Sequence, residues 1–307
     1  MTRMRKKEIE RRLSETVEGR VAADEPISRH TTLGVGGPAD IMVFPRSEAE
    51  LRGVLRLVAE NTVPLLALGG GSDLIVRDGG FRGVVLALAR NLSGSKIVGD
   101  RTIEAMAGET FASLLRLSRE ASLAGLEFLV TIPGTVGGGV VTNVGAFGGS
   151  FAETLESIHL IDGRGRETAI EKRDLRASYR KIEIPAGAVV SRARFALEPA
   201  ARSEVEEKVA RFREHRLRTQ PLTEASAGCI FKNPSPWEYA GRLIDQAGLK
   251  GLSIGGASVS SVHANYFVND GKATAADVLA LIDEVQRRVE ESSGIRLEPE
   301  VRIVGDA

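Results

Sequence analysis

The stretch Thr131–Gly149, TIPGTVGGGVVTNVGAFGG, constrains this chain most, because it holds seven glycines, one proline and no charged residue. Glycine lets the backbone adopt positive φ angles and approach a ligand closely, at a cost in chain entropy. The polar groups that remain are backbone N–H donors, small hydroxyls and the amide of Asn143. Such a surface suits a bound anion or a flat polar ring better than it suits catalysis by side chains. We therefore expect this glycine stretch to hold a large, phosphate-bearing cofactor.

Two standard nucleotide loops do not fit the sequence. A Walker A loop requires Gly-Lys-Ser/Thr, and neither glycine cluster contains that lysine. A dinucleotide-binding turn requires G-x-G-x-x-G between a strand and a helix, and neither Gly34–Gly37 nor Gly69–Gly71 has that context. What remains is the first glycine loop, Gly69–Asp73, together with Pro133–Gly149. Both could present backbone donors to one pyrophosphate; the alternative is that each is only a tight connection.

Composition excludes several classes of protein. The 41 basic and 41 acidic residues among 307 balance, so no net field favours nucleic acid or a membrane surface. One cysteine excludes an intramolecular disulfide and indicates a reducing compartment. None of the four histidines pairs at metal-ligand spacing, and we expect no metal site. The basic N-terminus lacks an apolar signal region, and no apolar run reaches the length of a membrane span. We expect a cytoplasmic protein without membrane insertion.

Hydrophobic periodicity and capping signals predict alternating helices and strands, with a βαβ-type arrangement in the first part of the chain. The predicted helices cover Arg3–Val17, a segment from the capping box Ser47–Glu50 to about Glu60, Thr110–Ala121, Glu204–Arg218, Glu238–Ala247 and Thr274–Ser292. The predicted strands cover Ile41–Phe44, Pro64–Leu68, Gly83–Leu88, Thr102–Met106, Ile158–Ile161, Arg166–Ile170, Val189–Leu197 and Ile295–Val304. Asp162–Gly165 is expected to join two of these strands as a hairpin.

An ordered set of short motifs resembles the UDP-N-acetylenolpyruvoylglucosamine reductase family, from about residue 24 to the end of the chain. In the first two thirds these motifs are TTLGVGGPAD (31–40), GGGS (69–72), IPGTVGG (132–138), NVGAFG (143–148) and Tyr179-Arg180. In the last third they are SAGCIFKNP (226–234), GRLID (241–245), AGLKG (247–251), His263-Ala-Asn265 and EPEVR (298–302). Each motif alone is weak, but the ordered set is specific.

The resemblance implies an α+β fold: a two-part FAD-binding domain of the vanillyl-alcohol-oxidase/PCMH type, followed by a C-terminal α/β substrate domain. The expected boundaries are 1–95 and 96–215 for the two FAD-binding subdomains and 216–295 for the substrate domain, with a final strand at about 296–307 packing back on the first subdomain. The spacing between Arg180 and Cys229 resembles the shorter form of the family. FAD is expected to be non-covalent, because no histidine lies in either glycine loop.

By the same resemblance, FAD is held by backbone and small side chains of the two loops. The expected cofactor-binding residues are Gly69, Gly70, Gly71, Ser72, Asp73, Pro133, Gly134, Thr135, Gly137, Gly138, Asn143, Gly145 and Ala146. The family usually has asparagine at position 73, and a carboxylate beside a pyrophosphate is unfavourable unless it is paired or points away.

The family reduces the enol ether of UDP-N-acetylglucosamine enolpyruvate to UDP-N-acetylmuramate, a step in peptidoglycan precursor synthesis. The resemblance implies that NADPH reduces FAD and that flavin N5 then delivers hydride to the terminal enolpyruvyl carbon. The carbanion next to the substrate carboxylate then requires a cation, a polarising group and a proton donor. Arg180, Glu300 and Cys229 match these three roles in turn.

Cys229 stands where many family members carry serine as the proton donor. A thiol is a far stronger acid than an alcohol, so cysteine can serve the same role; the alternative is an inert, buried thiol. The candidates for the UDP group are Lys232 and Asn233, a compact cation and an amide suited to phosphate and base edges, and Tyr179 is the candidate for the substrate sugar. His263 is a further substrate-binding candidate, the alternative being a structural role, since Val262 precedes it where many relatives have lysine.

Two other functions fit part of these observations. Another FAD-dependent oxidoreductase on the same scaffold, such as an alcohol or sugar oxidase, would explain the glycine loops but not Arg180, Cys229 and Glu300 in register. A flavin- or nucleotide-sugar-binding regulator without catalysis would leave all three side chains unused. The sequence does not distinguish NADPH from NADH or fix the oligomeric state.

Overall fold

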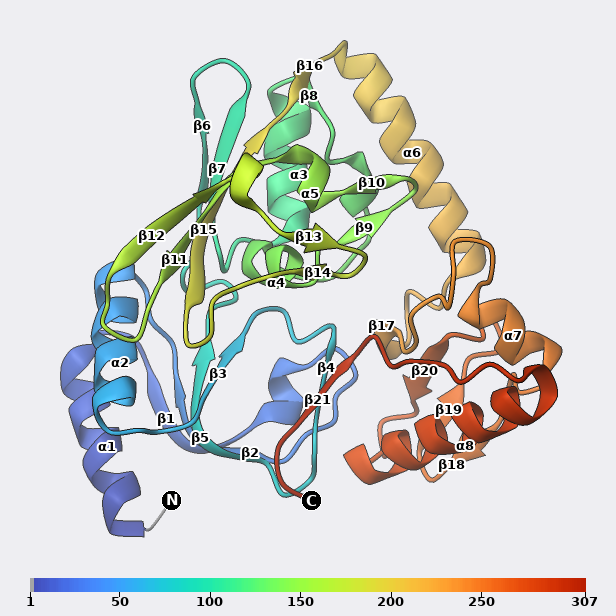
Figure 1. Cartoon of the computed structure of the whole chain (residues 1–307), viewed down its shortest axis with the longest axis horizontal. Coiled ribbons are helices and arrows are strands. Elements are labelled where there is room, and N and C mark those ends of the chain that lie inside the picture. The colour runs from blue at the N-terminus through green and yellow to red at the C-terminus, as the bar shows by residue number, and fades with distance from the viewer. Residues whose placement is uncertain (1–2) are drawn as a thin grey trace. The chain divides into compact units, whose positions relative to one another are not determined.

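The computed structural model describes residues 3–307 and contains two compact units, each built from several stretches of the chain (Figure 1). The first comprises the chain up to Asp24, Asp40–Gly70 and Gly83–Glu214. The second comprises Glu25–Ala39, Gly71–Arg82 and His215–Ala307. The first glycine loop is therefore shared between the units, with Gly69 and Gly70 in the first and Gly71–Asp73 in the second. The predicted three-domain division stays a prediction.

The first unit is organised by a four-stranded sheet of order β1-β2-β5-β3 and a five-stranded sheet of order β12-β11-β15-β7-β6. The strands of the first sheet are β1 (Val21–Pro26), β2 (Pro38–Val43), β3 (Leu65–Leu68) and β5 (Phe81–Ala87). The strands of the second sheet are β6 (Ser95–Val98), β7 (Thr102–Met106), β11 (Leu155–Ile161), β12 (Glu167–Glu171) and β15 (Val189–Ala196). Strands β3 and β5 are parallel, and all four pairings in the second sheet are antiparallel.

In the described part of this unit, six α-helices and three short strand pairs accompany the two sheets. The helices are α1 (Arg3–Thr16), α2 (Glu48–Glu60), α3 (Phe111–Glu120), α4 (Val136–Val141), α5 (Phe151–Thr154) and α6 (Arg202–Thr219), the last of which continues into the second unit. The strand pairs are β8 (Leu123–Ala124) with β16 (Glu198–Pro199), β9 (Gly145–Ala146) with β10 (Gly149–Ser150), and β13 (Ala177–Ser178) with β14 (Lys181–Ile182).

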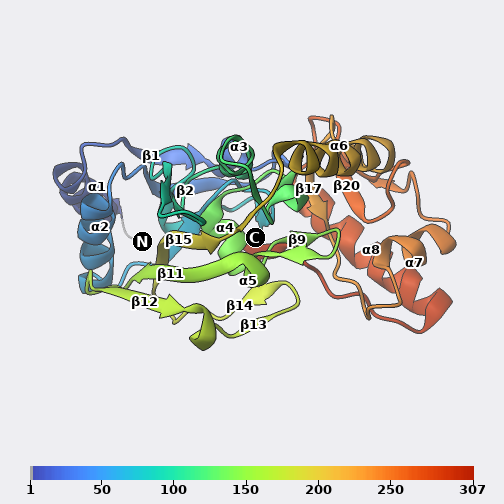
Figure 2. The ribbon, with the colours of Figure 1, turned by 90° about the horizontal axis from the view of Figure 1, so that it is seen from above.

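Helix α2 shows why the predicted helices form. Its buried residues Leu51, Val54, Leu55 and Val58 recur at helical spacing, so one face packs into the core. Helices α1 and α2 lie side by side in both ribbon views (Figures 1 and 2). The predicted capping box is half right. Ser47 accepts a hydrogen bond from the Glu50 N–H, whereas the Glu50 carboxylate bonds the backbone N–H of Arg46, one residue before the cap.

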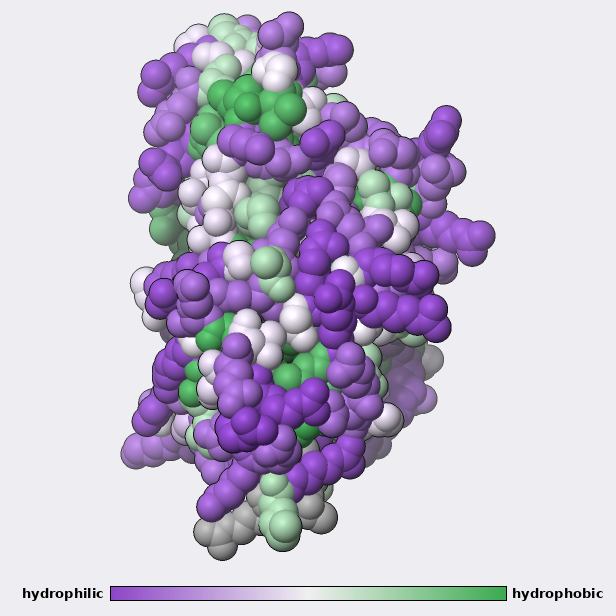
Figure 3. Space-filling model, turned by 90° about the vertical axis from the view of Figure 1, so that its left-hand side faces the viewer, coloured by the Kyte–Doolittle hydropathy of each residue, from purple (hydrophilic) through white to green (hydrophobic). Residues whose placement is uncertain are grey.

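A charged network joins α2 to the five-stranded sheet across a mostly hydrophilic face (Figure 3). Arg192 of β15 contacts Glu48 of α2 at 2.6 Å and also pairs with Glu167 of β12, which in turn binds Arg52 of α2. Partial burial pushes the pKa of the Glu167 carboxyl upward, but hydrogen bonds from Arg52 and His159 and the charge of Arg192 outweigh it and lower the pKa below its usual value.

The second unit contains the four-stranded sheet β17-β20-β19-β18 and the parallel pair β4 and β21. Its strands are β4 (Leu74–Val76), β17 (Ala225–Cys229), β18 (Ser253–Ile254), β19 (Ala257–Val259), β20 (Tyr266–Asn269) and β21 (Arg302–Val304), and its helices are α7 (Ala240–Gln246) and α8 (Ala275–Ser293). The four-stranded sheet was not predicted, and the predicted final strand is shorter than expected. Among residues 3–307, no helix is both long and apolar enough to cross a membrane.

The start of α8 is fixed by two carboxylates. Thr274 is the predicted N-cap, and it forms a capping box with Asp277. Asp78, from a distant part of the sequence, accepts hydrogen bonds from the backbone N–H groups of Ala275 and Ala276, both at 2.9 Å. Because unpaired N–H groups at a helix start favour a negative charge, Asp78 connects the segment after β4 to α8.

We expect Asp78→Ala to lower the free energy of unfolding by about 1–2 kcal/mol, since it removes two capping hydrogen bonds. Urea unfolding measures the change. The control is Asp283→Ala on the exposed side of the same helix, for which a change within about 0.5 kcal/mol is expected. Equal losses in the two variants would contradict the capping role of Asp78.

Candidate functional site

The first glycine loop and the glycine stretch meet within the first unit. A Cβ atom on Gly69 would lie 2.4 Å from Thr135 Oγ1, and one on Gly70 would lie 2.9 Å from Gly134 Cα. Both separations are too short for real atoms, so this contact requires glycine at both positions. Two loops that are more than 60 residues apart in sequence thus form one surface of backbone groups.

The glycine stretch is not the continuous loop that the sequence predicted. It contains helix α4 and the β9–β10 hairpin. The backbone N–H groups of Val136 and Gly137 bond the carbonyls of Glu109 and Ala107 at 2.9 and 2.8 Å, which ties the start of α4 to the loop before α3. A Cβ atom on Gly139 would lie 2.6 Å from the Phe151 ring. Several of these glycines therefore allow α4 to pack closely.

Thr135 differs from the glycines around it. It precedes α4 and is only 2 % exposed. Its Oγ1 is buried without a hydrogen-bond partner among the residues that the structure describes. Leaving a buried hydroxyl unpaired is unfavourable by about 1–3 kcal/mol. A polar group of a ligand bound at the contact of the two glycine loops could supply the hydrogen-bond partner that this hydroxyl lacks.

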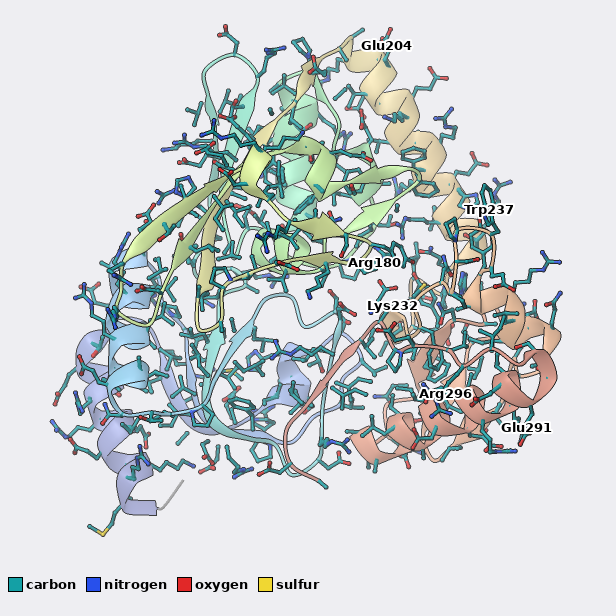
Figure 4. All side chains as sticks on the ribbon, viewed as in Figure 1. Arg180, Glu204, Lys232, Trp237, Glu291 and Arg296 are labelled. Carbon is teal, nitrogen blue, oxygen red and sulfur yellow. The ribbon has the colours of Figure 1, made fainter. Side chains whose placement is uncertain are left out.

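Arg180 reaches the glycine stretch from the β13–β14 hairpin, whose turn is Tyr179-Arg180 (Figure 4). Its Nη1 donates to the carbonyl oxygen of Gly145 at 2.9 Å, and its guanidinium carbon lies 5.5 Å from the Tyr179 ring centroid. Arg180 has φ of 60°, in the left-handed region that non-glycine residues seldom occupy. A strained backbone at a candidate site is typical of functional residues.

Asn143 links the same two segments. Its Nδ2 donates to the Ser178 carbonyl at 2.9 Å, and its Oδ1 accepts from the Ala152 N–H at 3.0 Å. The predicted cofactor-binding amide is thus engaged with the protein itself, and it holds the turn that carries Arg180.

The second unit brings Cys229 and Glu300 onto adjacent backbone segments. Cys229 ends β17, where it pairs with Tyr266, and its residue is partly exposed. The Glu300 N–H donates to the carbonyl of Ile230, the neighbour of Cys229, at 2.7 Å. One backbone hydrogen bond therefore brings two predicted catalytic residues from distant parts of the sequence onto neighbouring segments.

Asn265 fixes the segment after Cys229. Its Oδ1 accepts from the Phe231 N–H at 3.0 Å, and its Nδ2 donates to the Phe231 carbonyl at 2.8 Å. Its own carbonyl accepts from the Ile230 N–H at 2.9 Å. This buried asparagine was not predicted as a site residue, although it stands in the quoted motif with His263.

An open pocket of about 410 Å³ lies in the second unit beside Cys229. Asn233 and His263, both predicted to bind substrate, line it. Its other lining residues are Tyr239, Gly241, Arg242, Asp245, Lys250, Val262, Ala264 and Asn265. Burial, together with the nearby charge of Lys250, lowers the pKa of the His263 imidazole, which favours its neutral form at pH 7.

Four more predicted residues have contacts within the second unit. Lys232 forms an ion pair with Glu298, and Figure 4 labels it on the segment that follows β17. Asn233 Oδ1 accepts from the Ala240 N–H at 3.1 Å, at the start of α7. Gly71 has φ of 62°, and a Cβ atom there would lie 2.1 Å from the His30 carbonyl oxygen. The backbone carbonyl of Asp73 accepts from the Arg302 N–H at 3.1 Å.

The predicted residues thus fall into two groups. The first unit contains Gly69, Gly70, Pro133, Gly134, Thr135, Gly137, Gly138, Asn143, Gly145, Ala146, Tyr179 and Arg180. In one set of contacts, Gly69 and Gly70 lie against Thr135 and Gly134; in another, Asn143 and Arg180 join the glycine stretch to the β13–β14 hairpin. The second unit contains Gly71–Asp73, Cys229, Lys232, Asn233, His263 and Glu300.

Comparison with known proteins gives consistent results for both parts of the chain. A family model described as an FAD binding domain matches residues 39–171, and one described as the C-terminal domain of UDP-N-acetylenolpyruvoylglucosamine reductase matches residues 220–304. The predicted fold class, an FAD-binding domain followed by a C-terminal domain of this family, is confirmed.

Relatives match over nearly the whole chain. The UDP-N-acetylenolpyruvoylglucosamine reductase of Geotalea uraniireducens is 44 % identical over 96 % of this chain and 97 % of its own. That of Geobacter metallireducens is 43 % identical over 97 % and 99 %. The crystal structure of the Thermus caldophilus enzyme of the same name superposes with a TM-score of 0.80 at 36 % identity, covering 93 % of this chain and 98 % of that one. The chain therefore belongs to the UDP-N-acetylenolpyruvoylglucosamine reductase family.

Proposed function

We propose that this protein reduces the enol ether of UDP-N-acetylglucosamine enolpyruvate to UDP-N-acetylmuramate, with FAD as its bound cofactor and NADPH as the reductant. The observation that carries the proposal is the placement of Cys229 and Glu300 on adjacent backbone segments, with Cys229 lining an open pocket, in a chain of this family. The product is a peptidoglycan precursor, and the proposal places the enzyme in the cytoplasm.

The glycine surface of the first unit fits the pyrophosphate of FAD. Gly69 and Gly70 lie against Thr135 and Gly134 without intervening side chains, so backbone N–H groups can approach phosphate oxygens closely. The unpaired hydroxyl of Thr135 supplies a donor at the same place. When bound, FAD supplies the hydride that adds to the terminal enolpyruvyl carbon, after its own reduction by NADPH.

Three side chains of this protein stabilise and then protonate the carbanion that this hydride addition creates. Arg180 binds the substrate carboxylate, because a guanidinium can hold it through two parallel hydrogen bonds. Glu300, in its protonated form, donates to the oxygen on which enolate character develops. Cys229 gives its thiol proton to the carbon that bears the ether oxygen, which completes the addition of hydride and proton across the double bond. The thiolate then takes a proton from water.

The nucleotide part of the substrate is assigned to the second unit. Asn233 lines the pocket beside Cys229, and because its carbonyl oxygen bonds the start of α7, its NH2 group is the one directed to the nucleotide. Lys232 supplies a cation to the diphosphate, and His263 supplies a neutral ring to the same pocket. Tyr179, 57 % exposed beside Arg180, contacts the sugar.

The proposal is tested by anaerobic spectroscopy on the purified protein. We expect a yellow protein that is bleached by NADPH and re-oxidised by the enolpyruvyl nucleotide but not by UDP-N-acetylglucosamine. Re-oxidation by neither nucleotide, with turnover of an alcohol or sugar instead, would identify an oxidase on the same scaffold. A colourless protein unable to take up FAD would overturn the proposal.

Variants of Cys229 test the proton donor. We expect Cys229→Ser to keep substantial turnover, because a hydroxyl can replace the thiol at the same position. Cys229→Ala should slow re-oxidation of the flavin by the enol ether by about 100-fold or more, in line with the loss of a general acid, and leave reduction by NADPH unchanged. Stopped-flow absorbance separates the two half-reactions. Wild-type re-oxidation by the alanine variant would refute the assignment.

Thr135→Val tests the cofactor site through two measurements, of FAD affinity and of the stability of the apo-protein, for which we expect different results. Loss of a hydrogen bond to a charged phosphate should weaken FAD binding by about tenfold or more. The free energy of unfolding of the apo-protein should not fall, because the variant removes a buried hydroxyl that has no partner in the described structure. Flavin fluorescence titration and urea unfolding measure the two effects.

The matched control is Thr142→Val at the other end of α4, where the hydroxyl bonds the Gly138 carbonyl of its own helix. This control should leave FAD affinity within about twofold of wild type. Unchanged FAD affinity in Thr135→Val would remove Thr135 from the cofactor site.

A further inference from the structure

The β9–β10 hairpin is too small to be stable by itself. Each strand has two residues, and the turn between them is Phe147-Gly148. Isolated two-stranded hairpins are at best marginally stable in water, even when they are longer. Contacts outside the hairpin must therefore fix its position, and that position matters because Gly145, in β9, accepts the hydrogen bond from Arg180.

The base of the hairpin is held from two sides. Arg180 Nη1 donates to the Gly145 carbonyl at 2.9 Å. On β10, a Cβ atom on Gly149 would lie 2.7 Å from the Phe128 ring, so the backbone packs directly on that ring.

The tip of the hairpin is held by aromatic stacking on α6. The rings of Phe147 and Phe212 are nearly parallel, with centroids 4.1 Å apart and an interplanar angle of 5°. Figure 1 shows the turn between β9 and β10 reaching the lower half of α6. Stacked aromatic pairs contribute beyond the area they bury, so this contact fixes the end of the hairpin.

Phe147 occupies a position where glycine or asparagine is the usual residue. Its φ is 53° and that of Gly148 is 81°, as in the two-residue turns that favour glycine. A phenylalanine with positive φ is unfavourable in itself. The turn therefore keeps a strained residue whose ring makes the stacking contact.

Phe212 is itself fixed on α6. Lys208 Nζ and the guanidinium carbon of Arg211 lie 6.0 and 5.4 Å from its ring centroid, distances at which cations interact with aromatic faces. Lys208 also pairs with the buried carboxylate of Glu127 at 3.3 Å. These contacts hold the Phe212 ring in the position where it stacks on Phe147 of the hairpin.

We propose that Phe212 is a positioning residue for Arg180. Stacking on Phe147 fixes the β9–β10 hairpin, and the hairpin fixes the Gly145 carbonyl that orients the guanidinium. Arg180 needs this support because its own turn joins two strands of only two residues each and it has positive φ. The inference rests on the proposed role of Arg180 at the substrate carboxylate.

The test compares Phe212→Ala, which loses the stacking, with Phe212→Tyr, which keeps it. In the FAD-loaded enzyme, we expect Phe212→Ala to slow re-oxidation by the enolpyruvyl nucleotide by about five- to tenfold. Reduction by NADPH should stay within twofold of wild type, and Phe212→Tyr should restore re-oxidation. Leu217→Ala, at an exposed position on the same helix, is the control and should have no effect.

Two further measurements separate positioning from a general loss of structure. Hydrogen exchange of the amides of residues 145–150 and 178–181 should accelerate in Phe212→Ala, while amides of the five-stranded sheet stay protected. In a double-mutant cycle with Arg180→Lys, the two effects on re-oxidation should be strongly non-additive, because Phe212 acts through Arg180.

Phe147→Gly provides the same test if Phe212→Ala folds poorly, since glycine accepts the positive φ while removing the ring. Equal slowing of both half-reactions, additive effects in the cycle, or unchanged exchange of the hairpin amides would overturn the proposal. A wild-type enzyme that the enolpyruvyl nucleotide does not re-oxidise would instead refute the proposed function, and the exchange data would then still show whether Phe212 orders the two hairpins.

Discussion

The first unit depends on a contact that contains almost no side chains. Gly69 and Gly70 lie directly against Thr135 and Gly134, at separations that exclude a Cβ atom on either glycine. At Gly70 the contact is backbone on backbone, against Gly134 Cα, so no rotamer of either residue can adjust to a change in spacing. The same contact buries the Thr135 hydroxyl, which is unpaired among the described residues, so the constraint on packing and the proposed phosphate site have one origin.

The residues proposed for chemistry are positioned by elements that are weak individually. Arg180 and the Gly145 carbonyl belong to two minimal hairpins, and Asn143 joins them through the Ser178 carbonyl. The larger sheets contribute rigidity, while these small elements set the direction of the guanidinium. Two non-glycine residues with positive φ, Phe147 and Arg180, occur in their turns. Both turns therefore place a strained residue beside the proposed carboxylate site, as is common at functional sites, although Thr62, Arg90 and Ser122 also have positive φ elsewhere in the chain.

Sequence patterns predicted the elements whose periodicity or capping is strong. Helices α2, α3 and α8 and the β11–β12 hairpin appear where expected, since their apolar spacing, caps or turn residues leave few alternatives. Helix α6 also appears where it was predicted, although its sequence is strongly charged. The sheet formed by β17, β20, β19 and β18 was missed because its strands are short, and β17 is rich in small residues and contains a bulge after Ser226. Helix α4 was missed because its sequence, VGGGVV, has low helix propensity, and the tertiary contacts of Val136 and Gly137 stabilise it instead.

The sequence motifs proposed which residues belong to the candidate site but not how they are arranged. Motifs selected Arg180, Cys229 and Glu300, yet only the paired backbone of Ile230 and Glu300 explains why the last two lie on neighbouring segments. Asn265 was overlooked because a buried amide leaves no periodic signal. Its side-chain amide makes two hydrogen bonds with the Phe231 backbone: Nδ2 donates to the carbonyl, and Oδ1 accepts from the N–H. An aspartate could make only one of these two bonds. A slip of one residue in this segment would place a glycine or an isoleucine where the thiol stands, so Asn265 determines whether the proposed proton donor occupies this position.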